Sequence, residues 1–316
     1  MRLFLGVDGG QSSTTALIGD EHGRVLGAGS GGPCNHAGKA EGRDRFMSAV
    51  SKSVGEACAQ AGLDPDRIVF DTACFGLSGG PEDKVAIIHS LLRIERLVAT
   101  DDAVIALSGA TAGEPGIITI AGTGSIAFGR SAAGKRARVG GWGYIFGDEG
   151  SGFDIARQAL RAALRFEEGW GPATALHPAL LEATASRTAN EVLHCFYTDE
   201  WPRSRVATLA RLVDQTAEAG DAVARVIILN AAQHLAALTG SVRHQLWAPG
   251  DEVPVAYIGG AFRSRLLLER YRMLVELEPG SLCGVPVYHP AAGALIEAYR
   301  AAGLRPALNN VPEMKS

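Results

Sequence analysis

The feature that most constrains this chain is a pattern that occurs twice, in which two apolar runs flank a short turn of glycines and hydroxyl residues. At residues 3–20 the runs LFLGVD and TTALIGD enclose GGQSS, and at residues 116–130 the runs GIITIA and SIAFGR enclose GTG. Short apolar runs bounded by turn residues indicate buried strands, and strands joined by a short turn pair antiparallel. The repetition predicts two sheet domains of one architecture.

The rest of the chain continues each half in a similar way. After the first pair of strands we expect a strand at RVLGAGS, a helix over 41–61, a strand at IVFDTACFGLSG, a helix over 81–92 and a strand at RLVAT. After the second pair we expect a strand at KRARVGG, helices from about 152 to 245, a strand at VAYIGG, a helix at RSRLLLERYRMLVEL, a short strand at VPVYH and a final helix at PAAGALIEAYRAAG. The tail after Arg305 is expected to fray. The expected domains are an N-terminal lobe at 1–115 and a C-terminal lobe at 116–289, with the helix at 290–305 packing back on the first lobe.

Composition excludes several classes of protein. A length of 316 residues suggests about two domains, and 47% hydrophobic with 20% charged residues is an ordinary globular balance. A net charge of −4 gives no basic field for nucleic acid or anionic membrane. The five cysteines form no C-x-x-C pair, the N-terminal apolar run is too short for a signal peptide, and no stretch approaches the length of a membrane span. We therefore expect a cytoplasmic protein with no nucleic-acid or membrane partner.

The first glycine turn has the residues of a phosphate site. Phosphate turn 1, residues 7–14, places Asp8 at the end of a strand and then offers glycine backbone N–H groups and side-chain hydroxyls. A carboxylate repels phosphate, so a bridging Mg²⁺, held by Asp8 through water, is implied. The alternative is that D-G-G only turns a hairpin. The residues expected to bind nucleotide here are Gly9, Gly10, Gln11, Ser12, Ser13 and Thr14.

A second and a third glycine turn strengthen this interpretation. Phosphate turn 2, residues 121–125, offers Gly122, Thr123, Gly124 and Ser125 at the equivalent place in the second half. A third turn, Gly259–Gly260, opens a helix and can lie against a nucleotide base or ribose. Each motif is weak alone, but three together favour nucleotide binding, with one phosphate turn in each lobe.

The order and position of these turns resemble the ATPase fold shared by sugar kinases, actin and the Hsp70 chaperones. Within that superfamily, the run GGWGYIFGDEGSG at residues 140–152 is similar to the N-acetylglucosamine kinase group and its relatives, the BadF/BcrA-type activating ATPases of benzoyl-CoA reductases and acyl-CoA dehydratases. The resemblance implies an α/β fold of duplicated ribonuclease H-like (actin-like ATPase) domains with an interdomain cleft. It also implies ATP and Mg²⁺ as cofactors, a small sugar as substrate and a homodimer.

The acceptor site carries over from the resemblance residue by residue. In T-D-D-A, Asp102 matches the base that deprotonates the sugar hydroxyl, and Asp101 lies where it can tune the pKa of Asp102, although two aspartates at this point can also cap a helix. The expected sugar contacts are Asn35, Trp142, Gly143 and Asp148, with Asp101 and Ser78 in the same pocket. Asp148 and Glu149 can instead cap the helix that begins near Ser151, and Trp142 would more often be a core residue.

These residues predict in-line phosphoryl transfer from MgATP to a hydroxyl of an amino sugar, with N-acetylglucosamine the first candidate and a 6-phosphate product. Glucosamine, N-acetylmuramic acid and glucose remain open, and Asp101 beside Asp102 slightly favours a cationic sugar. A different class, the ATP-driven activators, uses a cysteine near the second glycine turn to hold an iron–sulfur cluster. Residues 115–130 contain no cysteine, which argues against that class.

Overall fold

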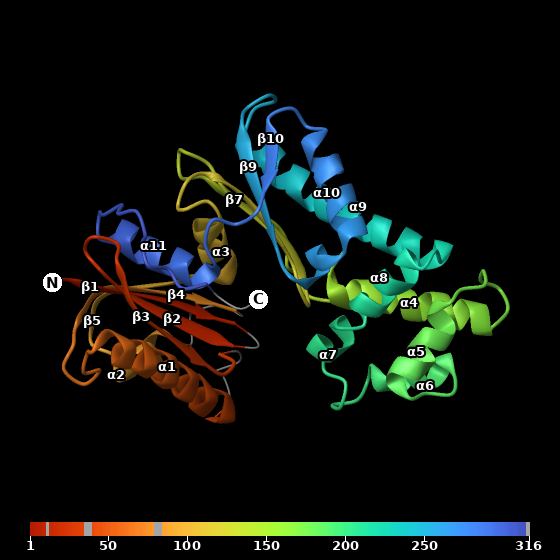
Figure 1. The fold of residues 1–316 in the computed structure, drawn as a ribbon, viewed down its shortest axis with the longest axis horizontal. Coiled ribbons are helices and arrows are strands. Elements are labelled where there is room, and N and C mark those ends of the chain that lie inside the picture. Colours follow the sequence, from red (N-terminus) through yellow and green to blue (C-terminus); the bar gives the residue numbers. More distant parts are fainter. Residues whose placement is uncertain (11–12, 35–39, 79–83, 314–316) are drawn as a thin grey trace. The chain divides into compact units, whose positions relative to one another are not determined.

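The computed structural model describes residues 1–10, 13–34, 40–78 and 84–313, and within it the chain forms two compact units (Figure 1). Unit 1 comprises Met1–Glu114 together with Pro286–Ser316, and unit 2 comprises Pro115–Val285. The chain therefore leaves unit 1 at Glu114 and returns to it at Pro286. Each unit is built around one five-stranded sheet.

Unit 1 is a mixed sheet with helices on both faces. The strand order is β3-β2-β1-β4-β5, in which β1, β2 and β3 pair antiparallel and β1, β4 and β5 pair parallel. Its elements are β1 (Leu3–Gly9), β2 (Thr14–Asp20), β3 (Val25–Gly31), α1 (Ala40–Ala61), β4 (Phe70–Leu77), α2 (Val85–Leu91), β5 (Ile94–Asp101), α3 (Asp102–Ala110) and α11 (Pro290–Ala301).

Unit 2 repeats this topology. Its sheet has the order β10-β9-β6-β7-β8, with an antiparallel meander through β6, β7 and β8 and parallel pairing of β6, β9 and β10. Its elements are β6 (Gly116–Ala121), β7 (Ser125–Arg130), β8 (Arg136–Gly140), α4 (Gly152–Glu167), α5 (Leu176–Thr184), α6 (Ala189–Cys195), α7 (Arg203–Ala207), α8 (Ala210–Glu218), α9 (Ala222–Leu246), β9 (Val253–Ile258), the 3₁₀ helix η1 (Gly260–Arg263), α10 (Arg265–Glu276) and β10 (Ser281–Gly284). The predicted duplication of an α/β sheet domain is confirmed.

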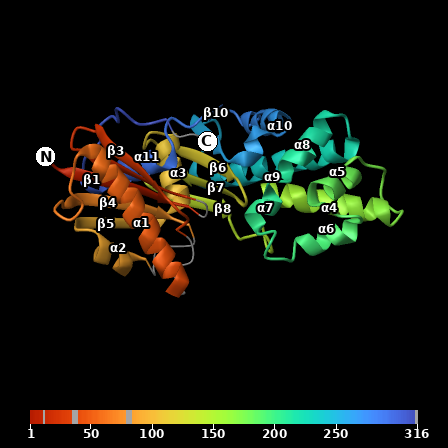
Figure 2. The same ribbon diagram turned by 60° about the horizontal axis from the view of Figure 1, so that its bottom comes forward.

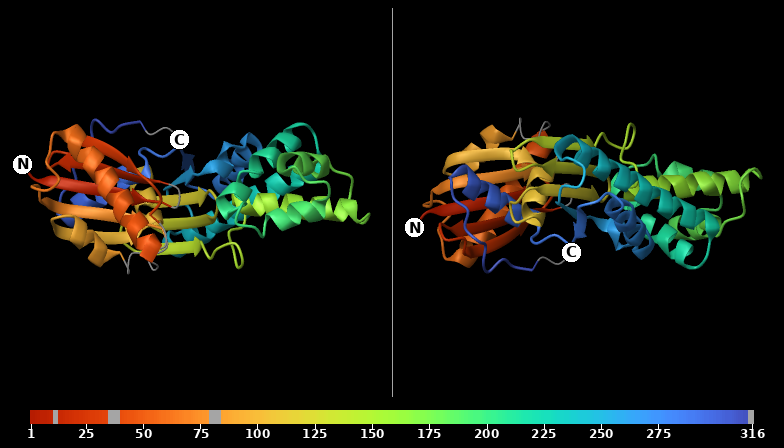
Figure 3. Two further views of the ribbon diagram at one scale, coloured as in Figure 1. Left: turned by 90° about the horizontal axis from the view of Figure 1, so that it is seen from below. Right: turned by 90° about the horizontal axis from the view of Figure 1, so that it is seen from above.

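One face of the unit 1 sheet is covered by α1, which crosses the strands in Figure 2 and in the left view of Figure 3. The contact is close because alternate residues of β3 are glycines. A Cβ at Gly27, Gly29 or Gly31 would lie 2.0–2.2 Å from a backbone carbonyl oxygen of α1. The glycines of β3 therefore admit a helix close to the strand.

The opposite face is covered by α11, seen in front of the strands in the right view of Figure 3. A Cβ at Gly6 in β1 would lie 2.2 Å from the backbone nitrogen of Leu295 in α11. Phe4 and Tyr299 stack with ring centroids 4.6 Å apart, and the Tyr299 hydroxyl donates to the Asp20 carbonyl at 2.7 Å. The C-terminal helix is therefore an integral part of unit 1.

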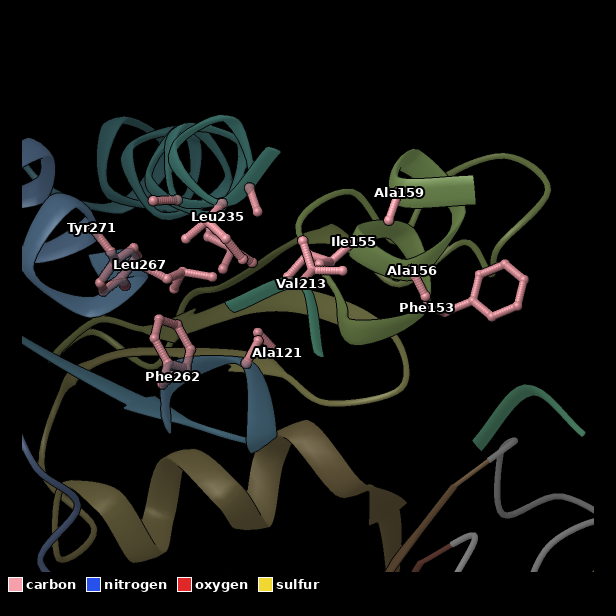
Figure 4. Close-up of a cluster of buried hydrophobic side chains, with 14 of the residues drawn as sticks. Ala121, Phe153, Ile155, Ala156, Ala159, Val213, Leu235, Phe262, Leu267 and Tyr271 are labelled. Carbon is pink, nitrogen blue, oxygen red and sulfur yellow. The ribbon is translucent and has the colours of Figure 1, made fainter. Parts of the chain in front are cut away.

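The core of unit 2 lies between its sheet and the helices α4, α8, α9 and α10. Figure 4 shows Leu235, Leu267 and Tyr271 gathered near Phe262, with Ile155 and Val213 continuing the cluster. The buried Tyr271 hydroxyl is satisfied by Thr239 Oγ1 at 3.0 Å.

The helix α9 qualifies a prediction made from the sequence. Its 25 residues are long and apolar enough to span a membrane, so the expectation that no stretch approaches that length is wrong. Ile228, Leu235 and Val242 of this helix lie in the core of unit 2.

Two expectations about the C-terminal region also fail. VPVYH is not a strand, because Pro286 lacks an N–H and the N–H groups of Val287 and Tyr288 donate to the Ala110 and Gly109 carbonyls at the end of α3. The last strand before Pro286 is β10, which belongs to unit 2. The tail is not frayed at Asn309, which exchanges backbone hydrogen bonds with Gly23 and Val25.

Candidate active site

The polar residues of unit 1 that the sequence singled out meet at one edge of its sheet. β1, β4 and β5 are parallel, and the register pairs Asp8 with Gly76 and Leu77 with Asp101. The C-terminal ends of the three strands therefore coincide, which is where ligands bind in open α/β sheets. Asp8 lies at the end of β1, Ser78 follows β4, and Asp102 follows β5.

Asp102 is held by a short chain of hydrogen bonds. Ser78 Oγ donates to Asp102 Oδ2 at 2.6 Å, and Lys84 Nζ donates to the Ser78 carbonyl at 3.1 Å. Only 1% of Lys84 is exposed. Asp102 also lies in the first turn of α3, where the helix dipole favours a carboxylate. The sequence analysis missed Lys84, whose signal was a lone lysine shortly after the glycine turn that ends β4.

Asp8 lies in the electrostatic field of Asp102. Burial, and secondarily the charge of Asp102, raises the pKa of the Asp8 carboxyl from its usual 3.8 to about 7. The two carboxylates would both be stabilised by a cation, so this edge of the sheet fits Mg²⁺. Among the described residues no group of three or more His, Cys, Asp or Glu side chains forms a metal cluster.

Asp101 differs from Asp102 in its surroundings. It is exposed and occupies the N-cap position of α3 with extended backbone, but its side chain accepts no capping hydrogen bond. The capping alternative therefore has no side-chain bond to support it at Asp101.

Phosphate turn 1 connects β1 to β2, so it is a hairpin connection as well as a candidate anion site. The Gly10 N–H donates to the Ser13 carbonyl at 2.9 Å, and Ser13 is exposed. Thr14 is buried, and its hydroxyl lies 2.7 Å from the Gly32 carbonyl and 2.8 Å from Cys34 Sγ. A Cβ at Gly9 would lie 2.7 Å from the Leu77 side chain. Gln11, Ser12 and the predicted sugar contact Asn35 lie outside the described residues.

Phosphate turn 2 and the third glycine turn line one cavity of unit 2. The cavity has a volume of about 640 Å³, and its walls include Gly122, Thr123 and Gly260. Gly259 has φ +118°, and a Cβ there would lie 2.4 Å from the Ala121 carbonyl oxygen. The two turns therefore touch through backbone, which requires glycine at this position.

The far wall of this cavity carries polar residues that the sequence analysis did not identify. They come from α7 and its C-cap residue, from α8 and from η1. Asp214 of α8 is hydrogen-bonded to Ser264, which caps α10. A purine and a ribose need hydrogen-bonding groups of this kind. The only signal in the sequence was the polar face of an amphipathic helix. These residues are Ser204, Thr208, Arg211, Asp214, Gln215 and Arg263.

The predicted site residues of the segment 140–152 differ from one another in their exposure. Trp142 is 75% exposed, so it is not a core residue, and Gly143 has φ +79° with open space where a Cβ would lie. Asp148 is 5% exposed and accepts the Ser125 N–H of phosphate turn 2 at 3.2 Å. Gly124 lies against this carboxylate, with a Cβ position 2.9 Å from its oxygens.

The helix cap near this segment is not Asp148 or Glu149. Ser151 is the N-cap of α4, and its hydroxyl accepts the Asp154 N–H at 3.2 Å. The Ser125 hydroxyl donates to the Glu149 carbonyl at 2.7 Å. The 148–151 turn is therefore hydrogen-bonded to phosphate turn 2 by side chain and backbone.

The chain is similar in sequence to two characterised sugar kinases. The chain is 30% identical over 283 residues to an N-acetylmuramic acid/N-acetylglucosamine kinase of Clostridium acetobutylicum, covering 88% of this chain and 91% of that protein. It is 30% identical over 314 residues to an N-acetyl-D-glucosamine kinase of Dictyostelium discoideum, covering 94% and 97%.

A solved structure supports the same grouping. A Chromobacterium violaceum protein described as a candidate N-acetylglucosamine kinase superposes with a TM-score of 0.77 at 27% identity, covering 93% of this chain and 98% of that one. The expected duplicated ribonuclease H-like fold is confirmed. The model of the BadF/BadG/BcrA/BcrD ATPase family matches residues 5–298. The chain therefore belongs to the BadF/BadG/BcrA/BcrD ATPase family.

Proposed function

We propose that this protein is an ATP-dependent kinase that phosphorylates an amino sugar, with N-acetylglucosamine as the preferred acceptor and the 6-phosphate as the product. The observation that carries the proposal is the carboxylate Asp102, oriented by Ser78 at the edge of the unit 1 sheet beside Asp8. Two relatives that align over most of their length are kinases of N-acetylated sugars, which supports the same acceptor class.

Asp102 is assigned as the general base. A base must hold an oxygen lone pair toward the acceptor hydroxyl while its own position is fixed. The Ser78 hydrogen bond fixes Oδ2 and leaves Oδ1 without a hydrogen bond to any described residue. Asp8 is assigned to Mg²⁺, which would supply charge neutralisation at the phosphates when bound.

The nucleotide is assigned to unit 2. Gly122 and Thr123 of phosphate turn 2 are proposed to meet the phosphates, and Gly260 the adenosine, in the cavity of about 640 Å³. The Thr14 and Ser125 hydroxyls already bond within the protein, so we assign them to supporting the turns. Ser13, Gly9 and Gly10 remain the candidates for nucleotide contacts in phosphate turn 1.

The choice of sugar weighs the charge of the pocket against the acceptors of the relatives. A free ammonium on glucosamine would favour an unpaired carboxylate in the pocket, whereas an acetamido group needs none. Asp148 is paired with Arg203, which leaves Asp101 as the carboxylate that favours a cationic sugar. Charge at Asp101 alone would favour glucosamine, but two relatives aligned over most of their length are kinases of N-acetylated sugars, so we place N-acetylglucosamine first. Glucosamine, N-acetylmuramic acid and glucose are the remaining alternatives. Asp148, Trp142, Gly143 and Asn35 are proposed as sugar contacts.

A second candidate function is that of an ATPase that activates a CoA-ester reductase or dehydratase. This is the class of the BadF/BcrA-type activating ATPases. The absence of cysteine from residues 115–130 weighs against it. We also propose that the protein is cytoplasmic and forms a homodimer. Size-exclusion chromatography with light scattering would test the homodimer.

The proposal is tested by an ADP-release assay over N-acetylglucosamine, glucosamine, N-acetylmuramic acid and glucose, with and without Mg²⁺. We expect sugar-dependent and Mg²⁺-dependent ADP release, fastest with N-acetylglucosamine. ADP release that is the same without sugar would contradict kinase activity and favour the activator class.

A further inference from the structure

Asp148 is held in an unusual backbone conformation. Its φ of +62° lies in the left-handed region, which a residue with a Cβ adopts rarely and only when its surroundings enforce it. Its two carboxylate oxygens have different partners. Oδ1 accepts the Ser125 N–H of phosphate turn 2, and Oδ2 accepts Arg203 Nη2 at 2.9 Å.

Arg203 reaches Asp148 from the first position of α7, 55 residues further along the chain. Its guanidinium carbon lies 4.5 Å from the centre of the Tyr144 ring and 5.6 Å from that of Phe153. Stacking on aromatic faces fixes the plane of a guanidinium, and a partly desolvated contact of this kind is stronger than an exposed one. Arg203 therefore binds both ends of the segment 144–148, through a ring at one end and a carboxylate at the other.

The backbone of this segment is tied to α4 as well. Arg157 Nη1 donates to the Tyr144 carbonyl at 3.1 Å, and the Tyr144 and Phe153 rings lie 5.2 Å apart. The side chains of Trp142, Ile145 and Phe146 have no such contacts with the part of the chain that the structure describes, and they are 75%, 66% and 83% exposed. The exposed side chains thus depend on Tyr144 and Asp148 for their position.

α7 also borders the nucleotide cavity. Ser204 and Ala207, which follow Arg203 on this short helix, line the cavity of about 640 Å³ together with Thr123. One helix therefore contacts both the proposed nucleotide site and the carboxylate that fixes the segment 144–148.

We propose that Arg203 is a positioning residue for the acceptor sugar, which holds Asp148 and Tyr144 so that the segment 142–148 presents its sugar contacts. The inference rests on the proposed kinase function. It assigns no contact between Arg203 and the reacting atoms. Removing the guanidinium should therefore weaken sugar use selectively and leave ATP binding nearly intact.

The test compares Arg203→Met with Arg205→Met, the same substitution on the same helix. Arg205 stacks 4.1 Å from the Trp201 ring and donates to the Glu200 carbonyl, but the described structure gives it no bond to Asp148 or Tyr144. We expect Arg203→Met to raise KM for the sugar about tenfold to a hundredfold, with KM for ATP changed less than about threefold. Arg205→Met should leave both values near wild type. Arg203→Lys keeps the charge but not the planar stacking, so its KM for the sugar should lie between those of the wild type and Arg203→Met. This variant also keeps the test valid if Arg203→Met folds poorly.

Amide hydrogen exchange of residues 142–150 gives a readout that needs no activity. Exchange should be faster in Arg203→Met and unchanged in Arg205→Met. Equal exchange in the two variants, or faster exchange with an unchanged KM for the sugar, overturns the inference. If the wild type phosphorylates no sugar but Arg203→Met alone exchanges faster, the kinase assignment fails while the positioning of the segment by Arg203 is supported.

Discussion

Replacing Asp8 with asparagine should stabilise unit 1, and the gain should grow with pH. The native carboxyl has a pKa of about 7 because burial and the charge of Asp102 disfavour ionisation, whereas the usual value is 3.8. The native state therefore binds this proton more tightly than the unfolded state does. It follows that wild-type stability falls as pH rises from about 4 to about 7, and stays at the lower level above that.

The magnitude follows from the width of this window. Each pH unit in which the native group is protonated and the unfolded group ionised costs about 1.4 kcal/mol. Between pH 5 and pH 8 this condition holds over about two pH units, up to the native pKa. The free energy of unfolding of the wild type should therefore fall by about 3 kcal/mol at most. Asp8 retains some accessible surface, and water near it reduces this figure to about 1–3 kcal/mol. Asparagine cannot ionise and should lose nothing by this route.

The assay is the free energy of unfolding of both proteins at pH 5 and pH 8, without nucleotide. Trp142, Trp170, Trp201 and Trp247 all belong to unit 2, so their fluorescence does not report unit 1. Scanning calorimetry or far-ultraviolet circular dichroism is the appropriate probe. The Asp101→Asn variant, at an exposed carboxylate of the same sheet edge, is the matched control. A stability difference between Asp8→Asn and wild type that is the same at both pH values would refute the reasoning. Added Mg²⁺ should narrow the difference at pH 8, because a bound cation favours the ionised carboxylate.

Three further predictions concern chemistry and packing. Asp102→Asn should lower kcat by about 10²–10⁴-fold, the usual contribution of a general base, and Asp101→Asn should do less harm; the reverse order in steady-state kinetics would move the base to Asp101. Gly259→Ala should destabilise unit 2 by about 1–3 kcal/mol, because φ is +118° and the new Cβ would meet the Ala121 carbonyl; an unchanged melting temperature would contradict this. Gly29→Ala should destabilise unit 1 by at least about 1–3 kcal/mol, because the Cβ would lie 2.0 Å from the Ser53 carbonyl, and urea titration would measure it.

The duplication could be predicted because both halves of the chain show the same local sequence pattern. Each half opens with an apolar strand, a glycine turn and a returning strand, and the two sheets have the same strand order. The final strand was misplaced because VPVYH has the composition of a strand, yet Pro286 and the carbonyls of α3 give its backbone other partners. Such competition between partners distant in sequence is not visible in a local pattern.

The candidate site was predictable where residues follow strand ends and not where they come from helices. Asp8 lies at the end of a strand, Ser78 and Asp102 each follow one, and the three meet because the strands are parallel. Lys84 and Arg203 contact the site through tertiary packing alone, and no periodicity or motif marks them. Glycine was the most ambiguous residue, because Gly259 at a turn and Gly29 under a helix look the same in sequence.

The most direct test of the proposed function is ³¹P nuclear magnetic resonance of a reaction containing the protein, MgATP and N-acetylglucosamine. The kinase assignment predicts one sugar 6-phosphate for each ADP formed, and loss of both signals in Asp102→Asn. The same reaction is repeated with glucosamine, N-acetylmuramic acid and glucose. Formation of ADP and inorganic phosphate without sugar phosphate in all four reactions would contradict the kinase assignment.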